Sequence, residues 1–133
     1  MIREFINSYN EFDFNPPAPV LDILLESPDP FLPKNIITIK RMALLDTGAD
    51  LTAIPEEVVG QLGLKKIDDI IVSDYKGNFF RTAVFAVHLI IKELIDSNIR
   101  VITSTLDYVH LGRDILNQWK LYLDASNKII RIN

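Results

Sequence analysis

The sequence predicts an all-β, barrel-like domain that carries two small helices. Short apolar stretches alternate with turn-forming residues along most of the chain, which is typical of small barrels. The 133 residues suit one compact domain with a modest core. A hydrophobic content of 48% with 24% charged residues indicates a folded chain and excludes a disordered one. The sequence contains no repeated module.

Residues 1–19 are predicted to form an appendage to a domain at residues 20–133. The apolar residues of this segment recur at the spacing of one face of a short helix: Ile2, Phe5, Ile6, Tyr9 and Phe12. The proline-rich stretch 15–19 would end that helix and act as a stiff spacer. The segment packs on the domain, forms a dimer contact or acts as a removable pro-segment, and the sequence leaves these three roles open.

The first half of the domain is predicted to contain three strands and one helix. The strands are expected at residues 20–25, 36–45 and 51–54. A proline-rich loop at 27–33 separates the first two strands. The helix is expected over residues 56–62, because Pro55 suits a helix start and acidic residues favour the positive end of the helix dipole. Gly63 is expected to close it.

The second half is predicted to contain one long hairpin and a group of shorter elements. The hairpin arms, 67–75 and 79–91, flank a compact turn signal at 76–78. Both arms are longer than an average strand, so the hairpin tip is expected to project beyond the sheet. The remaining elements are a strand at 99–106, a short helix at 115–119 and a terminal hairpin of 121–123 with 128–132.

Composition excludes several kinds of functional site. The chain has no cysteine, which removes disulfides, thiol nucleophiles and cysteine-type zinc sites. Its two histidines are too few for a histidine-rich metal site. The net charge is -4, and no run of Lys and Arg exceeds two residues, which argues against nucleic-acid binding. We therefore expect no cofactor, no metal and no nucleic-acid partner.

The sequence also predicts a cytoplasmic protein without a membrane partner. The first residues include acidic side chains and lack the apolar core of a signal peptide. The longest apolar run, 83–91, is interrupted by His88 and is far too short to span a bilayer. His88 itself is interpreted as a sheet residue with satisfied hydrogen bonds.

The octapeptide at residues 43–50 carries the strongest chemical signal. Its apolar residues lead directly into Asp46, Thr47 and Gly48. A carboxylate at the end of a buried strand is costly unless hydroxyl groups and backbone amides compensate it. Gly48 allows a tight turn and a close approach by a partner. Taken alone, the pattern also fits a turn-forming aspartate at a strand end.

Three features, in this order along the chain, resemble the retropepsin-like aspartic protease family. The first is the sequence Leu-Leu-Asp-Thr-Gly-Ala-Asp at 44–50, and the second is the hairpin centred on 75–78, where that family carries its flap. The third is Val-His-Leu-Gly-Arg-Asp at 109–114, followed by a short helix and terminal strands. The resemblance covers roughly residues 20–133. It implies a closed acid-protease barrel with a flap hairpin and one or two short helices.

The resemblance also implies roles for individual residues. One Asp46 from each of two subunits would hold a water, Thr47 would make a cross-subunit hydroxyl contact, and Gly48 would accept the substrate backbone. Arg113 would pair with Asp50 within a subunit. The substrate-binding and flap residues would be Ala49, Asp50, Asp74, Tyr75, Lys76, Gly77 and Asn78. The structural support of the catalytic turn would come from Asp50, Gly112 and Arg113.

A single copy of the aspartate motif implies a homodimer. Peptide hydrolysis by this chemistry needs one carboxylate as a base and a protonated neighbour as an acid. Two carboxyl groups in contact share one proton, so the pair titrates as a unit. We therefore predict a homodimeric aspartic endopeptidase that acts on extended peptides. Two alternatives stay open: a dimeric peptide-binding or assembly module with little hydrolysis, and a latent protease blocked by residues 1–19.

Three further patterns have more than one interpretation. His110 lies in the third motif, where it either packs in the core or lies near Asp46 and tunes activity against pH. Arg113 and Asp50 form either a structural ion pair or a solvated surface pair. The spacing of acidic and hydroxyl residues from Asp46 onward faintly resembles a calcium loop, but the loop lacks the required glycine, so we reject a calcium site.

Overall fold

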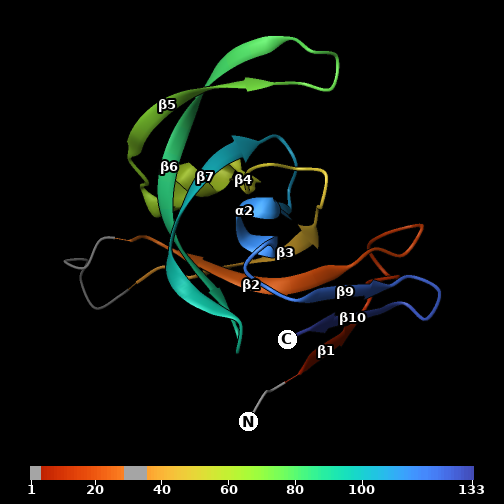
Figure 1. Cartoon of the computed structure of the whole chain (residues 1–133). Coiled ribbons are helices and arrows are strands. Elements are labelled where there is room, and N and C mark those ends of the chain that lie inside the picture. The colour runs from red at the N-terminus through yellow and green to blue at the C-terminus, as the bar shows by residue number, and fades with distance from the viewer. Residues whose placement is uncertain (1–3, 29–35) are drawn as a thin grey trace.

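The computed structural model describes residues 4–28 and 36–133 and contains a closed barrel of six strands (Figure 1). In hydrogen-bonded order these are β2 (Val20–Glu26), β3 (Ile39–Leu45), β8 (Val109–Leu111), β4 (Ala53–Pro55), β7 (Ile95–Ser104) and β6 (Phe79–Ile91). Pairing of β2 with β6 closes the ring. The predicted all-β barrel is confirmed.

Two strand pairs of the barrel are parallel, and one of them positions the site. Strands β3 and β8 pair in parallel, with Leu45 opposite Leu111, and β4 pairs in parallel with β7. The carboxyl ends of parallel strands meet at the same edge of a sheet. The residues that follow β3 and β8, Asp46 and Gly112, therefore emerge side by side although they are far apart in the sequence.

The barrel interior is filled by aliphatic side chains from every strand. Along β2, buried residues alternate with more exposed ones as one face of the strand turns inward. The most deeply buried large side chains are Leu21, Ile23, Leu25, Ile54, Val58, Val87, Leu89, Val101, Val109, Leu111, Ile130 and Ile132. Each such burial contributes about 1.5–3 kcal/mol relative to an exposed side chain, so the barrel is a rigid frame for its loops.

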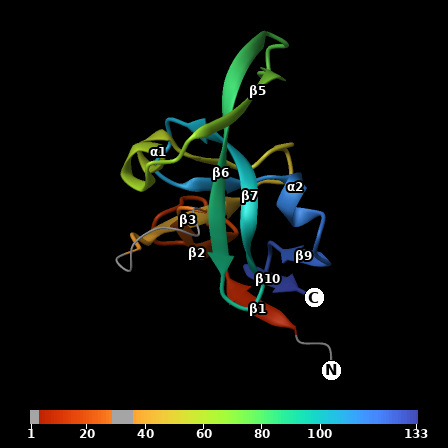
Figure 2. The same cartoon turned by 90° about the vertical axis from the view of Figure 1, so that its left-hand side faces the viewer.

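The long hairpin extends beyond the barrel, as predicted. Strand β5 (Lys66–Ser73) pairs antiparallel with the first part of β6, from Phe85 to Phe79. The rest of β6 pairs with β7 and β2 inside the barrel. Figure 2 shows the β5–β6 hairpin rising away from the other strands. Its tip is therefore carried on a two-stranded arm rooted in the barrel wall.

The N-terminal segment is a strand where the sequence predicted a helix. Strand β1 (Phe5–Ser8) pairs antiparallel with β10 (Ile129–Ile132), which pairs in turn with β9 (Leu121–Asp124). The helix prediction is wrong at residues 5–8, because a dozen residues form only a marginal helix while β10 offers a ready strand edge. The division of the chain at residue 19 stays a prediction.

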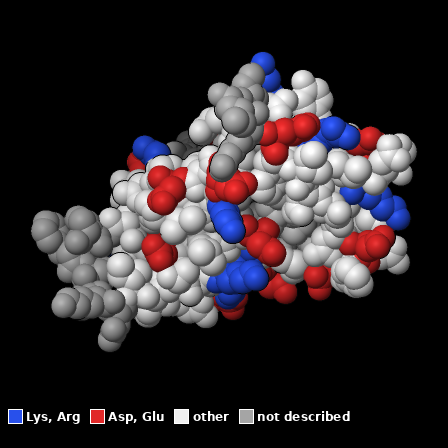
Figure 3. Space-filling model, turned by 90° about the horizontal axis from the view of Figure 1, so that it is seen from below, with Lys and Arg blue, Asp and Glu red and all other residues white. Residues whose placement is uncertain are grey.

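Ionic contacts also join the two ends of the chain. Lys128 lies 3.3 Å from Glu11, and Arg131 lies 3.5 Å from Glu4. Such exposed pairs contribute little free energy, so strand pairing carries this contact. Figure 3, a view from below, shows charges of both signs interspersed over that face of the molecule. This mixed face differs from the basic face of a typical nucleic-acid-binding protein.

Both predicted helices are present. Helix α1 (Glu56–Leu62) has the predicted bounds, and Gly63 follows it in the left-handed conformation with φ 62°. Helix α2 (Arg113–Leu116) begins and ends earlier than predicted, because the N–H groups of Ile115 and Leu116 already donate to the carbonyl of Gly112. Within residues 4–28 and 36–133, no helix is long and apolar enough to cross a membrane. Most of the predicted 27–33 loop lies outside the described residues.

Candidate active site

Asp46 lies directly after β3, at the edge where β3 and β8 both end. Its backbone N–H donates to the carbonyl of Leu111 at 2.9 Å, which extends the parallel pairing by one residue. Its carbonyl accepts the N–H of Ala49 at 3.2 Å, which closes a tight turn. The side chain is 32% exposed. The barrel thus fixes the backbone of Asp46 while its carboxylate remains partly open to solvent.

The two carboxylate oxygens of Asp46 have different partners. The backbone N–H of Gly48 donates to Oδ1 at 3.0 Å, and His110 Nδ1 lies 3.0 Å from Oδ2. A Cβ atom on Gly48 would lie 3.3 Å from Oδ1, so glycine permits this close approach. His110 therefore lies beside Asp46, which was one of its two predicted placements. Thr47, which lies between Asp46 and Gly48 in the turn, is exposed.

A partly buried hydrogen-bond network supports the Asp46 turn. The hydroxyl of Thr52 accepts the N–H of Gly112 at 3.1 Å and donates to Asp114 Oδ1 at 2.8 Å. The N–H of Thr52 donates to the other oxygen of Asp114 at 3.1 Å. Gly112 is required here, because a Cβ atom would lie 2.6 Å from the carbonyl carbon of Leu51. The network joins the two chain segments that meet behind Asp46.

The predicted pairing of Arg113 with Asp50 is present. The two side chains form an ion pair, and the backbone N–H of Arg113 donates to the carbonyl of Ala49 at 2.8 Å. Arg113 Nη1 also lies 3.4 Å from the carbonyl of Thr47. Both charged side chains are largely exposed, so the pair itself contributes little free energy. Its effect is to attach the Asp46 turn to the first residue of α2.

The tip of the hairpin is organised by one aspartate. The carboxylate of Asp74 accepts the backbone N–H groups of Lys76 and Asn78, each at 2.9 Å, and the side-chain amide of Asn78 at 3.3 Å. The N–H of Asn78, more than the other donors, holds the pKa of Asp74 below its ordinary value. Gly77 adopts φ 82°, which glycine tolerates best. The tip is thus a self-contained turn.

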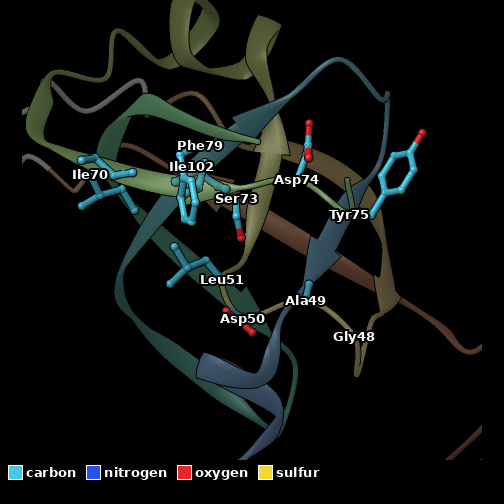
Figure 4. Close-up of a pocket in the computed structure, with 12 residues that line it drawn as sticks. Gly48, Ala49, Asp50, Leu51, Ile70, Ser73, Asp74, Tyr75, Phe79 and Ile102 are labelled. Atoms are coloured by element: carbon cyan, nitrogen blue, oxygen red, sulfur yellow. The ribbon is translucent and has the colours of Figure 1, made fainter. Parts of the chain in front are cut away.

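A cleft of about 700 Å³ separates this hairpin from the Asp46 turn. Its walls are residues 48–51 on one side, 70–75 with Phe79 on the other, and Ile102 on β7 (Figure 4). Phe79 and Leu51 point toward each other across the cleft, whereas the ring of Tyr75 points away from it. Tyr75 is 94% exposed. The cleft is open, and apolar side chains face it from both sides.

The predicted site residues divide into three groups. Ala49, Asp50, Asp74 and Tyr75 line the cleft together with Gly48, whereas Lys76, Gly77 and Asn78 lie in the tip beyond it. The third group, which does not line the cleft, comprises Asp46, Thr47, Gly112 and Arg113.

Sequence reasoning missed the support from Thr52 and Asp114 and the apolar lining by Leu51, Ile70, Phe79 and Ile102. The signal for Thr52 was a single hydroxyl within an otherwise apolar run that follows the aspartate motif.

Several solved structures share this fold. A retropepsin-like aspartic protease from Rickettsia conorii is 20% identical, with 98% of this chain and 90% of that chain covered and a TM-score of 0.60. The EIAV protease complexed with the inhibitor HBY-793 is 21% identical, with 76% of this chain and 86% of that chain covered and a TM-score of 0.55. The foamy viral protease-reverse transcriptase in complex with an RNA/DNA hybrid is 19% identical, with 76% of this chain and 12% of that chain covered and a TM-score of 0.53. These likenesses show a retropepsin-like fold.

The sequence itself gives the family. Residues 28–124 match the family model described as retroviral aspartyl protease. Comparison with curated protein sequences gave no match. The matched range includes the Asp46 turn, the β5–β6 hairpin and the Gly112 segment, which are the features that form the site described above. The chain therefore belongs to the retroviral aspartyl protease family.

Proposed function

We propose that the protein is a homodimeric aspartic endopeptidase whose catalytic residue is Asp46 in each subunit. The observation that carries this proposal is the geometry of Asp46. Its backbone is fixed by the barrel, one carboxylate oxygen is held by Gly48, and the side chain is partly exposed next to an open cleft. A carboxylate held in this way can take part in proton transfer without a change in its backbone.

The proposed reaction uses two Asp46 carboxyl groups that share one proton. The ionised group removes a proton from a bound water, and the resulting hydroxide attacks the carbonyl carbon of the peptide bond. The protonated group donates its proton to the carbonyl oxygen, which gives a tetrahedral intermediate. Transfer of a proton to the amide nitrogen then breaks the C–N bond and releases an amine and a carboxylic acid. Because each chain supplies one such aspartate, an isologous dimer is required.

The cleft supports an extended peptide as the substrate. A peptide between β5 and the 48–51 loop would present alternate side chains to opposite sides. Leu51, Phe79 and Ile102 would favour apolar side chains at some of these positions. A cytoplasmic location and the absence of nucleic-acid and membrane partners remain part of the proposal, supported by composition and charge.

Cleavage of a diverse peptide library by the purified protein tests this function. The assay would cover about pH 4 to pH 7, the range over which a shared-proton pair can act. Asp46→Asn is the test variant, and Asp22→Asn is the matched control because Asp22 is exposed on β2. Sedimentation of the same samples would establish the oligomeric state.

We expect cleavage by the wild type and the control, and none by Asp46→Asn. If all three proteins are dimers and none of them cleaves a peptide, the peptidase function is contradicted and a peptide-binding module is favoured. Cleavage by Asp46→Asn at the wild-type rate would contradict the role of Asp46.

A further inference from the structure

His110 is the second anchor of the Asp46 carboxylate, and its own geometry restricts what it can do. Its Nδ1 atom lies 3.0 Å from Asp46 Oδ2. Its Nε2 atom is buried and has no hydrogen-bond partner among the described residues. A buried nitrogen cannot reach a peptide in the cleft. His110 therefore acts through Asp46 and not on a substrate.

The surroundings of the ring determine where its proton lies. An ionised carboxylate can only accept a hydrogen bond, so Nδ1 must carry a proton when it contacts ionised Asp46. The alternative places the proton on Nε2, where a buried N–H group would lack an acceptor at a cost in free energy. The strand residues opposite His110, Leu44 and Ala53, are uncharged. The structure assigns the Nδ1–H form to His110 whenever the ring is neutral.

Two aromatic rings hold the imidazole of His110 in this orientation. Tyr108 stacks on it with ring centroids 5.1 Å apart and an interplanar angle of 25°. Phe14 contacts Tyr108 edge-on, with centroids 5.2 Å apart at 79°. Phe14 belongs to the N-terminal segment, which is held in a loop by paired hydrogen bonds between Asn10 and Ala18. A continuous line of contacts thus runs from the N-terminal segment to Asp46.

The two charged side chains that follow His110 most closely in the sequence, Arg113 and Asp114, have other partners. Arg113 pairs with Asp50, and Asp114 accepts hydrogen bonds from Thr52. Tyr108 contributes a ring face, and Asp46 contributes the charge that His110 contacts. The contact between His110 and Asp46 is therefore specific.

We propose that His110 is a positioning residue for Asp46 and that Phe14 and Tyr108 support it from the N-terminal segment. The carboxylate is then held at both oxygens, by Gly48 and by His110. In this arrangement the N-terminal segment supports activity and does not block it, which opposes the pro-segment role left open by the sequence. The effect on turnover rests on the proposed peptidase function, whereas the tautomer of His110 does not.

The first test measures the tautomer of His110 by ¹⁵N NMR of the imidazole nitrogens, at a pH where the ring is neutral. The chain has two histidines, so His88→Gln assigns the signals. We expect the Nδ1–H form in the wild type, and Asp46→Ala should shift the ¹⁵N resonance of Nδ1, because it removes the acceptor of the Nδ1–H hydrogen bond. A wild-type ring in the Nε2–H form, or an Nδ1 resonance that is the same in both proteins, would overturn the proposal whether or not the protein cleaves peptides.

The second test measures kcat and KM for three variants of the supporting residues. His110→Leu removes the donor and should lower kcat about tenfold or more with little change in KM, because loss of orientation affects the chemical step. His110→Asn places an amide nitrogen near the position of Nδ1 and should restore most of the loss. Phe14→Ala should lower kcat less than His110→Leu.

Phe12→Ala is the matched control for Phe14→Ala. Phe12 lies in the same segment but is 94% exposed, so its removal should leave kcat unchanged. A kcat for His110→Leu equal to that of the wild type, or equal losses in Phe14→Ala and Phe12→Ala, would overturn the proposal. If the wild type cleaves nothing, the proposed function fails and the tautomer measurement alone decides the role of His110.

Discussion

Two aspartate turns lie on opposite sides of the cleft, and they use their carboxylates differently. In both turns the carboxylate accepts the backbone N–H two residues later, from Gly48 at the barrel edge and from Lys76 at the hairpin tip. Asp74 accepts its other hydrogen bonds from Asn78 in the same turn. Asp46 instead contacts His110, which is 64 residues away in the sequence.

This difference separates a structural aspartate from a candidate catalytic one. Local donors satisfy Asp74, so its carboxylate serves its own turn and is held in the ionised form. Asp46 has a single local donor, and its second oxygen depends on a residue brought close by the parallel pairing of β3 with β8. A carboxylate that is anchored to the barrel and still partly exposed is suited to proton transfer.

The largest expected effect comes from Asp46→Asn. Loss of the ionisable group should lower kcat/KM by at least about 10²–10⁴-fold, the range supplied by general acid–base catalysis. The melting temperature should fall only slightly, since the amide oxygen still accepts the N–H of Gly48, although the amide nitrogen cannot accept the Nδ1–H of His110. Peptide cleavage and thermal unfolding measured on one sample check both statements. A large loss of stability with full activity would reverse the roles that we assign to the two turns.

The next largest effect concerns the support behind the Asp46 turn. Thr52→Val keeps the shape of the side chain but leaves the N–H of Gly112 without its partner and removes one of the two hydrogen bonds that Asp114 Oδ1 accepts. The expected loss is about 1–3 kcal/mol in the free energy of unfolding, the cost of buried unsatisfied polar groups. Denaturant titration measures it, with Thr105→Val as an exposed control. Equal stability of both variants would show that the network does not support the turn.

A smaller effect is expected from Asp74→Asn, which tests the self-contained turn at the hairpin tip. The folded pKa of Asp74 lies below its ordinary value of 3.8, mainly because Asn78 donates its backbone N–H. The stabilisation is therefore present above about pH 3.8 and is lost as the pH falls through the folded pKa.

Unfolding free energies measured at pH 6 and toward acid pH should fall less steeply for Asp74→Asn than for the wild type. Hydrogen exchange should also be faster at residues 76–78 in the variant. Identical pH dependence in the two proteins would mean that the carboxylate does not hold the tip.

The smallest effect is expected at the second histidine–aspartate contact of the chain. His88 on β6 contacts Asn98 at 2.6 Å and Asp96 at 2.5 Å, both on β7. The contact with Asn98 first, and then that with Asp96, raises the pKa of His88 above 6.5. Its stabilisation is complete below about pH 6.5 and fades as the pH rises through the folded pKa.

Between pH 6 and pH 8, the free energy of unfolding should therefore fall slightly less for His88→Gln than for the wild type. Denaturant titration measures this difference, and the rate of peptide cleavage should not change. A change in cleavage would show that this contact is coupled to the site.

The sequence predicted those parts of the fold that depend on local signals. Helix α1 with Gly63 and the hairpin turn at 76–78 follow from caps and turn residues that act over a few positions. The strand at residues 5–8 could not be predicted, because its partner β10 lies at the other end of the chain. Tertiary pairing decided between helix and strand there.

The candidate site was predictable where one motif carries it and not where distant segments meet. Asp46, Gly48 and the Arg113–Asp50 pair followed from the motifs and their resemblance to a known family. The contact of His110 with Asp46 was one of two alternatives, and the Phe14–Tyr108 stack was not foreseen. Ring contacts between residues nearly a hundred positions apart leave no periodic signal in a single sequence.

Mixing of wild-type and Asp46→Asn subunits tests most directly whether one active site needs an Asp46 from each of two chains. Wild-type protein at constant concentration would be allowed to exchange subunits with increasing amounts of the variant before peptide cleavage is measured. If the account is correct, the cleavage rate falls toward zero, because the variant captures wild-type subunits in inactive mixed dimers. A cleavage rate that stays constant in a large excess of the variant, with mixed dimers demonstrated in the same sample, would contradict a shared site.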